Sequence, residues 1–362
     1  MSAALGGIVG IFEMPNTNPL TTTPEALEHK IKRGTETAYT DFAYYFGGTF
    51  ENSKNLPLWE KLDGVCGIKI FMGASTGNLL SATDEEVEAV VANGNRVIAV
   101  HAEDEFLMNE NKKTILKDSN DVGMHCKWRD VNSSLNATKR VVSLAKKHNR
   151  HVHVLHITTA EEMDYLRNHK DTATVEVLPN HLTFHAPDCY EQLGTLAQQN
   201  PPIREKHHQD ALWQAINDGT VDIVASDHAP HTLEEKSGTY PNTPSGTPGV
   251  QTLLPVMLNH AANGKLSYER VVELMAYGPI KVHKLKNKCL ISEDYDADFT
   301  IVDPKMNHTI SNAEQASKSG WTPYDGMKIT GMPKMTIIRG QMVMREGELL
   351  DKIIAEPIAF NI

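Results

Sequence analysis

The feature that most constrains the fold is a regular alternation of short apolar, β-rich runs with longer helical stretches. The strand candidates lie at residues 8–13 (IVGIFE), 41–46 (DFAYYF), 67–72 (GIKIFM), 96–101 (RVIAVH), 151–157 (HVHVLHI), 173–178 (ATVEVL) and 221–226 (VDIVAS). Helical stretches lie between them, at residues 24–32, 83–92, 134–147, 160–168 and 205–217. Strict alternation favours right-handed crossovers and a parallel sheet, and strands this apolar are covered on both faces.

The number of strands bears on the kind of α/β fold. A (β/α)₈ barrel needs eight strands, and seven candidates are present. The chain opens with a helix-like segment, SAALGG, that runs straight into a strand, so we expect a TIM-type barrel lacking its first strand and half of its first helix. An open doubly wound sheet is the alternative. We expect the barrel over residues 1–285 and a small C-terminal β segment, part of a β-sandwich domain, over residues 286–362, where ADFTIVD, MTIIRG and QMVMREGEL occur.

Composition excludes several classes of protein. The formal net charge of −11 argues against a nucleic-acid partner, because phosphate contacts need clustered Lys and Arg. The four cysteines are scattered, which argues against a disulfide framework and fits a reducing cytoplasm. No apolar run is long enough to span a bilayer, and the opening residues lack the basic region of a signal peptide. We therefore expect a cytoplasmic protein with a small-molecule substrate.

Polar residues occur where four of the expected strands end. His101 ends one strand, His156 ends HVHVLHI, Asp227 follows VDIVAS, and Lys69 lies inside GIKIFM. Active sites of such barrels lie at the carboxyl ends of the strands, and imidazole with carboxylate is a typical ligand set for Zn²⁺.

Each of these residues also has a plain structural interpretation. A single histidine at a strand end is more often a hydrogen-bonded structural residue, as we expect for His151 and His153, and Asp227 could cap a helix. Lys69 is harder to explain in this way, because burial lowers the pKa of a lysine and a neutral amine can react with CO₂ to form a carbamate. The joint occurrence of the four residues favours a metal site.

The chain resembles the dihydroorotase branch of the amidohydrolase superfamily, with allantoinases and dihydropyrimidinases as near relatives. The resemblance covers essentially the whole chain. It rests on the motifs EMPNTNPLTTT (13–23), GIKIFMGASTGNLL (67–80), VHAED (100–104), LHITTAEE (155–162), NPPIR (200–204), SDHAPH (226–231) and ADFTIVD (297–303). MPNTNP and SDHAPH together are fairly specific, whereas VHAED and LHITT are shared more widely.

The resemblance implies a reaction and a set of roles. The reaction is the reversible conversion of dihydroorotate to N-carbamoyl-aspartate in de novo pyrimidine synthesis, with two zinc ions in a complete site. Lys69 resembles the carboxylated lysine that bridges them, although some relatives use an aspartate there. His101 and His156 resemble ligands of the second metal, and Asp227 resembles both a metal ligand and the general base. Four further positions match contacts to the substrate ring or its carboxylate: Asn16, Asn200, His231 and Gly246.

The sequence departs from the family at its start. The family's first strand carries an HxH metal pair and a nearby arginine, and this sequence has neither ahead of its first strand candidate at residues 8–13. We therefore expect the 362-residue chain to be impaired in activity and stability compared with an N-terminally extended version, which an assay of both with zinc and bicarbonate would test. The alternatives are an allantoinase- or hydantoinase-like enzyme and a non-catalytic homologue that acts as a scaffold. The family also suggests a homo-oligomer, with aspartate transcarbamoylase as a potential partner.

Overall fold

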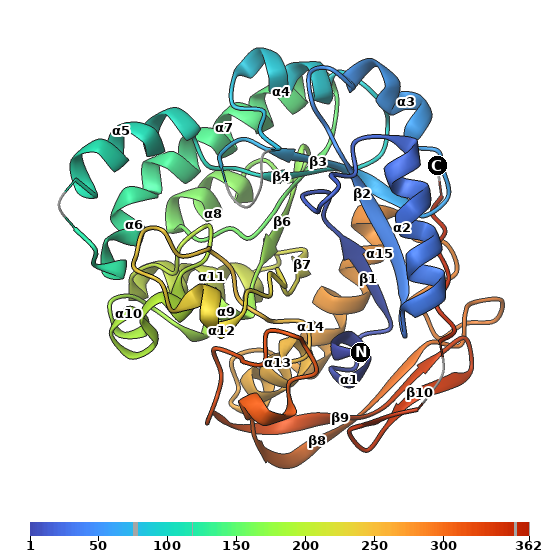
Figure 1. Cartoon of the computed structure of the whole chain (residues 1–362). Helices are drawn as coiled ribbons and strands as arrows, with labels where there is room; N and C mark the ends of the chain where they lie inside the picture. The colour runs from blue at the N-terminus through green and yellow to red at the C-terminus, as the bar shows by residue number, and fades with distance from the viewer. Residues whose placement is uncertain (75–78, 118, 351–352, 362) are drawn as a thin grey trace.

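The structure, a computed structural model, describes residues 1–74, 79–117, 119–350 and 353–361. A curved sheet of parallel strands is wrapped by helices, and a small antiparallel sheet lies beside it (Figure 1). Residues 75–78, which belong to the motif GIKIFMGASTGNLL, lie outside the described residues.

The parallel sheet contains the seven expected strands, and each pairs with the next one along the chain. They are β1 (Gly10–Glu13), β2 (Asp41–Gly47), β3 (Val65–Phe71), β4 (Ile98–His101), β5 (Val152–Val154), β6 (Ala173–Val177) and β7 (Ile223–Val224). A doubly wound sheet would reverse its strand order at a switch point, and this sheet does not. The sheet instead curls into part of a barrel, whose ends in the described residues are β1 and β7, so the predicted α/β barrel class is confirmed.

The helices cover the outside of the curled sheet (Figure 1). The helical stretches expected at residues 24–32 and 83–92 both begin after a capping residue: Thr23 accepts a hydrogen bond from the backbone of Ala26, and Thr83 forms a capping box with Glu86. No helix in the described part of the chain is long and apolar enough to cross a membrane. The helices are α1 (Ser2–Leu5), α2 (Pro24–Thr37), α3 (Leu56–Trp59), α4 (Asp84–Val91), α5 (Glu105–Ile115), α6 (His125–Trp128), α7 (Val131–Lys147), α8 (Ala160–Arg167), α9 (Pro179–Thr183), α10 (Asp188–Leu193), α11 (Lys206–Asn217), α12 (Leu233–Lys236), α13 (Leu253–Ala262), α14 (Tyr268–Val272) and α15 (Gly278–His283).

Alternation along the strands separates two layers of core. In β3, Ile68 and Ile70 belong to the large apolar cluster between the sheet and its helices. Cys66 belongs to a smaller cluster inside the curl, with Tyr45 and Leu155. It lies on the opposite face from Ile68 because the pairing of β3 with β2 shifts register between Val65 and Gly67, and regular alternation holds only after that shift. Because successive side chains of a strand point to opposite faces, Lys69 points into the curl, between two outward-facing isoleucines. The fold thus places a lysine on the concave side of the sheet.

The last part of the chain forms the predicted small β segment and then returns to the barrel. Its antiparallel sheet has the order β11-β10-β9-β8. Beyond it, the backbone of Ile358 donates to the carbonyl oxygen of Phe42 in β2 at 2.8 Å, and the Ile358 side chain joins the cluster inside the curl. The strands of the small sheet are β8 (Phe299–Thr309), β9 (Lys328–Ile338), β10 (Gln341–Arg345) and β11 (Glu348–Leu349).

Candidate metal centre and active site

The four predicted metal-site residues lie on four different strands or just after them. Lys69 is in β3, and His101 is the last residue of β4. His156 follows the end of β5, and Asp227 follows the end of β7. Because the strands are parallel, their carboxyl ends meet at one rim, where active sites of barrels lie.

His101 and His156 are in direct contact at this rim. His101 Nδ1 and His156 Nε2 are 3.1 Å apart, and the rings meet edge to face. Both rings are buried, and burial lowers the pKa of each below its ordinary value. The neutral imidazole that results is the form that binds metals. Two nitrogens on one tetrahedral zinc lie about 3.3 Å apart, since each Zn–N bond is about 2.0–2.1 Å. The spacing of the pair therefore fits two ligands of one metal ion.

Glu103 fixes the protonation of His101. Its Oε2 lies 2.8 Å from His101 Nε2, so this nitrogen carries the proton and Nδ1 presents its lone pair toward His156. Arg129 Nε donates to both carboxylate oxygens of Glu103 at 3.1 Å. Burial raises the pKa of Glu103, but Arg129 and His101 outweigh it and hold the pKa well below its usual range. Glu103 was not among the site residues predicted from the sequence, although it belongs to the motif VHAED.

The other ring nitrogen of His156 is unusual. His156 Nδ1 is buried and has no hydrogen-bond partner among the described residues. The residue also has φ of 38°, in the left-handed region that few side chains adopt, and Asp227 has φ of 43°. Backbone strain of this kind clusters at functional sites. The positive φ at His156 and Asp227 breaks the alternation of side chains that a regular strand would have. The direction of these two side chains therefore could not be predicted from the strand pattern of the sequence.

The pKa values of Lys69 and Asp227 are shifted in opposite directions, and both are shifted toward neutral pH. Burial lowers the pKa of Lys69 to about 7, against the opposing effects of Asp227 and Glu176. Burial also raises the pKa of Asp227 to about 6, Glu176 raises it further, and Lys69 opposes this. Asp227 has many protein atoms around it, which raise its pKa, but its side chain is also exposed to solvent. Water can therefore reach the carboxylate.

The metal-site residues are also coupled as a group. Charge on Lys69 lowers the pKa of both His101 and His156. Glu176, in β6, accepts a hydrogen bond from the backbone of His156 at 3.3 Å. Glu176 thus interacts with several members of the set, and nothing in its local sequence singled it out. His153 bonds Thr174 Oγ1 at 2.9 Å, as expected of a structural histidine.

The predicted substrate contacts lie on loops at this rim. Asn200 is buried, and its Oδ1 lies 3.0 Å from Nε2 of His125. Gly246 has φ of +136°, and a Cβ there would lie 2.6 Å from that of Ala229 and 3.3 Å from the His231 ring. Only glycine fits at this position, and it packs the loop around residue 246 against SDHAPH. Asn16 lies on the loop that follows β1.

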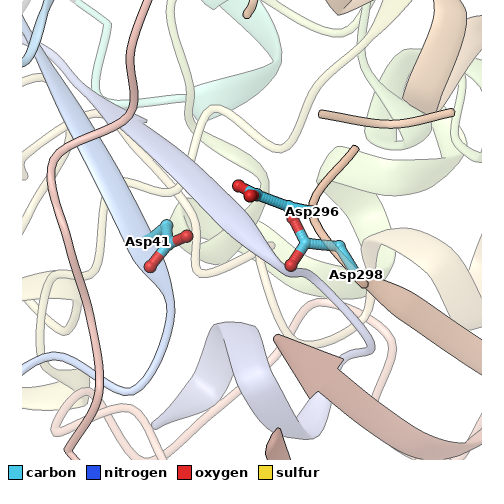
Figure 2. A group of neighbouring side chains, drawn as sticks. All are labelled: Asp41, Asp296 and Asp298. Carbon is cyan, nitrogen blue, oxygen red and sulfur yellow. The ribbon is translucent and has the colours of Figure 1, made fainter. Parts of the chain in front are cut away.

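A cluster of three aspartates lies away from this rim. The carboxylate oxygens of Asp41, Asp296 and Asp298 lie within 4.8 Å of one another. In the described ranges, no other three His, Cys, Asp or Glu residues bring potential ligand atoms this close together. Figure 2 shows the three side chains turned toward a common point. The ammonium group of Lys288 takes that point, 2.7–2.8 Å from all three. It is therefore an ion-pair cluster that joins β2 to the C-terminal segment. His101, His156 and Asp227 are not as tightly grouped, and an amine such as Lys69 is a ligand only after carboxylation.

Comparisons with known proteins show the family and the fold of the chain. The sequence profile of the Amidohydrolase family matches residues 7–343. A dihydroorotase of Methanosarcina acetivorans is 34% identical over 370 residues, which cover 98% of this chain and 77% of that protein. A dihydroorotase of Pyrococcus furiosus is 34% identical over 97% of this chain and 76% of its own length. The solved L-hydantoinase (dihydropyrimidinase) from Arthrobacter aurescens superposes with a TM-score of 0.93 at 29% identity, covering 99% of this chain and 82% of the other.

Proposed function

The chain belongs to the amidohydrolase family, and on that premise we propose that it is a dihydroorotase, which converts dihydroorotate reversibly to N-carbamoyl-aspartate in pyrimidine synthesis. It is a hydrolase of cyclic amides. The observation that carries the proposal is the buried pair of neutral imidazoles, His101 and His156, whose nitrogens are 3.1 Å apart. The pair lies at the carboxyl rim of the sheet, to which β3 brings Lys69 and the end of β7 brings Asp227.

The family and the donor set imply a metal cofactor. We propose zinc, held by His101, His156 and Asp227, with carboxylated Lys69 as a bridging ligand when two ions are present. One observation supports the fit: Glu103 holds the proton of His101 on Nε2, so that Nδ1 presents its lone pair toward Nε2 of His156, 3.1 Å away. When bound, the metal supplies Lewis-acid polarisation of a ring carbonyl and lowers the pKa of water.

The residues of the chain then handle the proton and the substrate. Asp227, whose pKa is raised toward neutrality, accepts a proton from the attacking water as the new C–O bond forms. It returns that proton to the ring nitrogen as the C–N bond breaks, so that the product carries the proton on its amide nitrogen. The reverse sequence closes the ring. We propose that Asn16, Asn200 and His231 bind the ring and its carboxylate, and that Gly246 offers backbone groups to the pyrimidine.

One observation favours a second candidate within the same class. The hydantoinase from Arthrobacter aurescens superposes with a TM-score of 0.93, so the fold equally accommodates an enzyme named for hydantoins. The two functions differ in the substrate, because dihydroorotate carries a carboxylate that many hydantoins lack. A non-catalytic scaffold is the remaining alternative, and the filled positions Lys69, His101, His156 and Asp227 argue against it.

Substrate profiling with a binding measurement separates these three functions. The purified chain, loaded with zinc and bicarbonate, is mixed with dihydroorotate, N-carbamoyl-aspartate, hydantoin, dihydrouracil or allantoin. Turnover is followed by absorbance, and binding of each compound is measured by calorimetry. We expect dihydroorotate to bind and react in preference to the uncharged rings. Preference for hydantoin or dihydrouracil would assign the second function, and no binding of any of these compounds would favour a scaffold.

We further propose a cytoplasmic homo-oligomer, with aspartate transcarbamoylase as a partner. The location is supported by the cysteines, all four of which are free thiols in the described residues, as is usual in a reducing compartment. Light scattering of the purified chain, alone and with the transcarbamoylase, would test the assembly.

A further inference from the structure

Lys236, the last residue of α12, has an unusual environment. Its side chain is fully buried, and in the described part of the chain its ammonium group forms no ion pair. The Nζ atom instead donates to three backbone carbonyl oxygens, those of Gln198 at 2.9 Å, Pro244 at 2.9 Å and Gly246 at 3.1 Å. An ammonium group has three N–H donors, so each donor has one acceptor. Burial lowers the pKa of Lys236 to about 7, and the three carbonyl acceptors favour the protonated form against that effect.

The three carbonyls belong to segments next to the proposed substrate contacts. Gln198 lies two residues before Asn200, and Pro244 and Gly246 lie on the loop that presents Gly246. Lys236 itself ends the short helix that follows His231, and Thr195 holds its carbonyl oxygen through a hydrogen bond of 2.6 Å. One ammonium group therefore joins the three loops that carry Asn200, His231 and Gly246.

Other hydrogen bonds connect the same loops. The backbone N–H of Gly246 donates to the carbonyl oxygen of Gln198 at 2.9 Å. The side-chain amide of Gln198 donates to Thr243 O at 2.9 Å and to Ser245 Oγ at 3.1 Å. Loops that are ordered before the substrate arrives do not have to be ordered by it, which strengthens binding.

We propose that Lys236 is a positioning residue for substrate recognition: by joining the loops of Asn200, His231 and Gly246, it holds them in the arrangement that binds the pyrimidine ring. This inference rests on the proposed function for the identity of the ligand, and on the contacts above for the positioning itself. It assigns Lys236 no contact with the substrate and no role in proton transfer.

The test compares Lys236→Met with wild type by hydrogen-exchange mass spectrometry and by dihydroorotate binding. Methionine keeps the length of the side chain and removes the donors, which leaves the carbonyls of Pro244 and Gly246 unpaired and takes from the Gln198 carbonyl one of its two donors. We expect exchange in peptides covering residues 242–248 to accelerate by about tenfold or more, and the dissociation constant for dihydroorotate to rise by about the same factor. In any variant that turns over, KM should rise more than kcat falls, because the substituted residue does not touch the reacting atoms.

Lys288→Met is the matched control. Lys288 is also a buried lysine with three oxygen partners, but these belong to the aspartate cluster at the start of β2. This variant should lose stability without faster exchange at residues 242–248 and without weaker dihydroorotate binding. Equal effects of both variants on that loop would overturn the proposal, because they would show general destabilisation.

A milder variant covers the case in which Lys236→Met does not fold. Thr195→Val removes only the hydrogen bond to the Lys236 carbonyl, so exchange at residues 242–248 should accelerate less but in the same direction. Unchanged exchange in a folded Lys236→Met variant, or in Thr195→Val if the first does not fold, would refute the positioning role. If exchange accelerates as expected but wild type itself does not bind dihydroorotate, the positioning role stands and the proposed function fails.

Discussion

Substitution of Glu103 tests the protonation scheme of the candidate metal site. Glu103 is completely buried and accepts hydrogen bonds from His101 Nε2 at 2.8 Å and from Arg129. Glu103→Gln keeps the size of the side chain but removes the charge. The NH₂ group of the new amide would then face either His101 Nε2 or Arg129, both of which are donors in the wild type. His101 could then move its proton to Nδ1, which would no longer bind a metal. Loss of such an outer partner costs about 10–100-fold in metal affinity, which is the effect that we expect for zinc.

The same substitution should lower stability by a calculable amount. It leaves the Arg129 guanidinium, whose side chain is 3% exposed, without its carboxylate. Breaking a buried ion pair costs about 3–5 kcal/mol, which corresponds to about 6–10 °C in Tm at about 2 °C per kcal/mol for a large domain. Because the folded pKa of Glu103 lies below its unfolded value, its contribution is present above the ordinary carboxyl pKa and is lost as the pH falls through the folded pKa. The stability of the variant should therefore fall less steeply in acid than that of wild type.

The assay is zinc affinity by competition with a chelator, together with calorimetric unfolding as a function of pH. Glu162→Gln is the control, since Glu162 is equally buried but bonds the hydroxyls of Thr138 and Thr159, and burial raises its pKa. It should leave zinc affinity unchanged. Wild-type zinc affinity in Glu103→Gln, or an equal loss in Glu162→Gln, would refute the reasoning.

Three further predictions concern the site and the aspartate cluster. Carboxylation needs a neutral amine, and burial lowers the pKa of Lys69 to about 7. The ¹³C NMR signal of the carbamate formed from labelled bicarbonate should therefore grow from about pH 6 to about pH 8. A signal that persists in Lys69→Ala would contradict the assignment. Asp227→Asn should lower turnover of dihydroorotate by about 10²–10⁴-fold, with a smaller change in its binding measured by calorimetry, and retention of wild-type turnover would exclude Asp227 as the base. Lys288→Ala should cost about 3–5 kcal/mol of unfolding free energy. Calcium should raise Tm more in this variant than in wild type, because the aspartates have then lost the ammonium group and only Asp41 keeps a cationic partner, Arg339; equal stabilisation of both proteins by calcium would show that Lys288 does not fill that site.

The order of the elements and most of the candidate site could be predicted from the sequence, because both depend on local pattern. Apolar β-rich runs predicted every strand of the curled sheet in the described residues, and the helical stretch predicted at residues 83–92 is confirmed as α4. In a parallel sheet of this kind, a polar residue at a strand end lies at the common rim. That rule is sufficient to place His101, the last residue of β4, without any knowledge of distant contacts, whereas Lys69 lies inside β3 and was singled out by its charge in an apolar strand.

What only the tertiary structure decided are pairings between residues far apart in the chain. Glu103 meets Arg129, 26 residues later, and His156 meets His101 across 55 residues. Lys236 bonds Gln198 across 38 residues, and Ile358 returns to Phe42 of β2. A local pattern states which face of an element is apolar and where the element ends, but it contains no information about which loops come together when the sheet curls. Those contacts depend on the closing of the whole chain, and they fix the tautomer, the loop positions and the strained backbone of the candidate site.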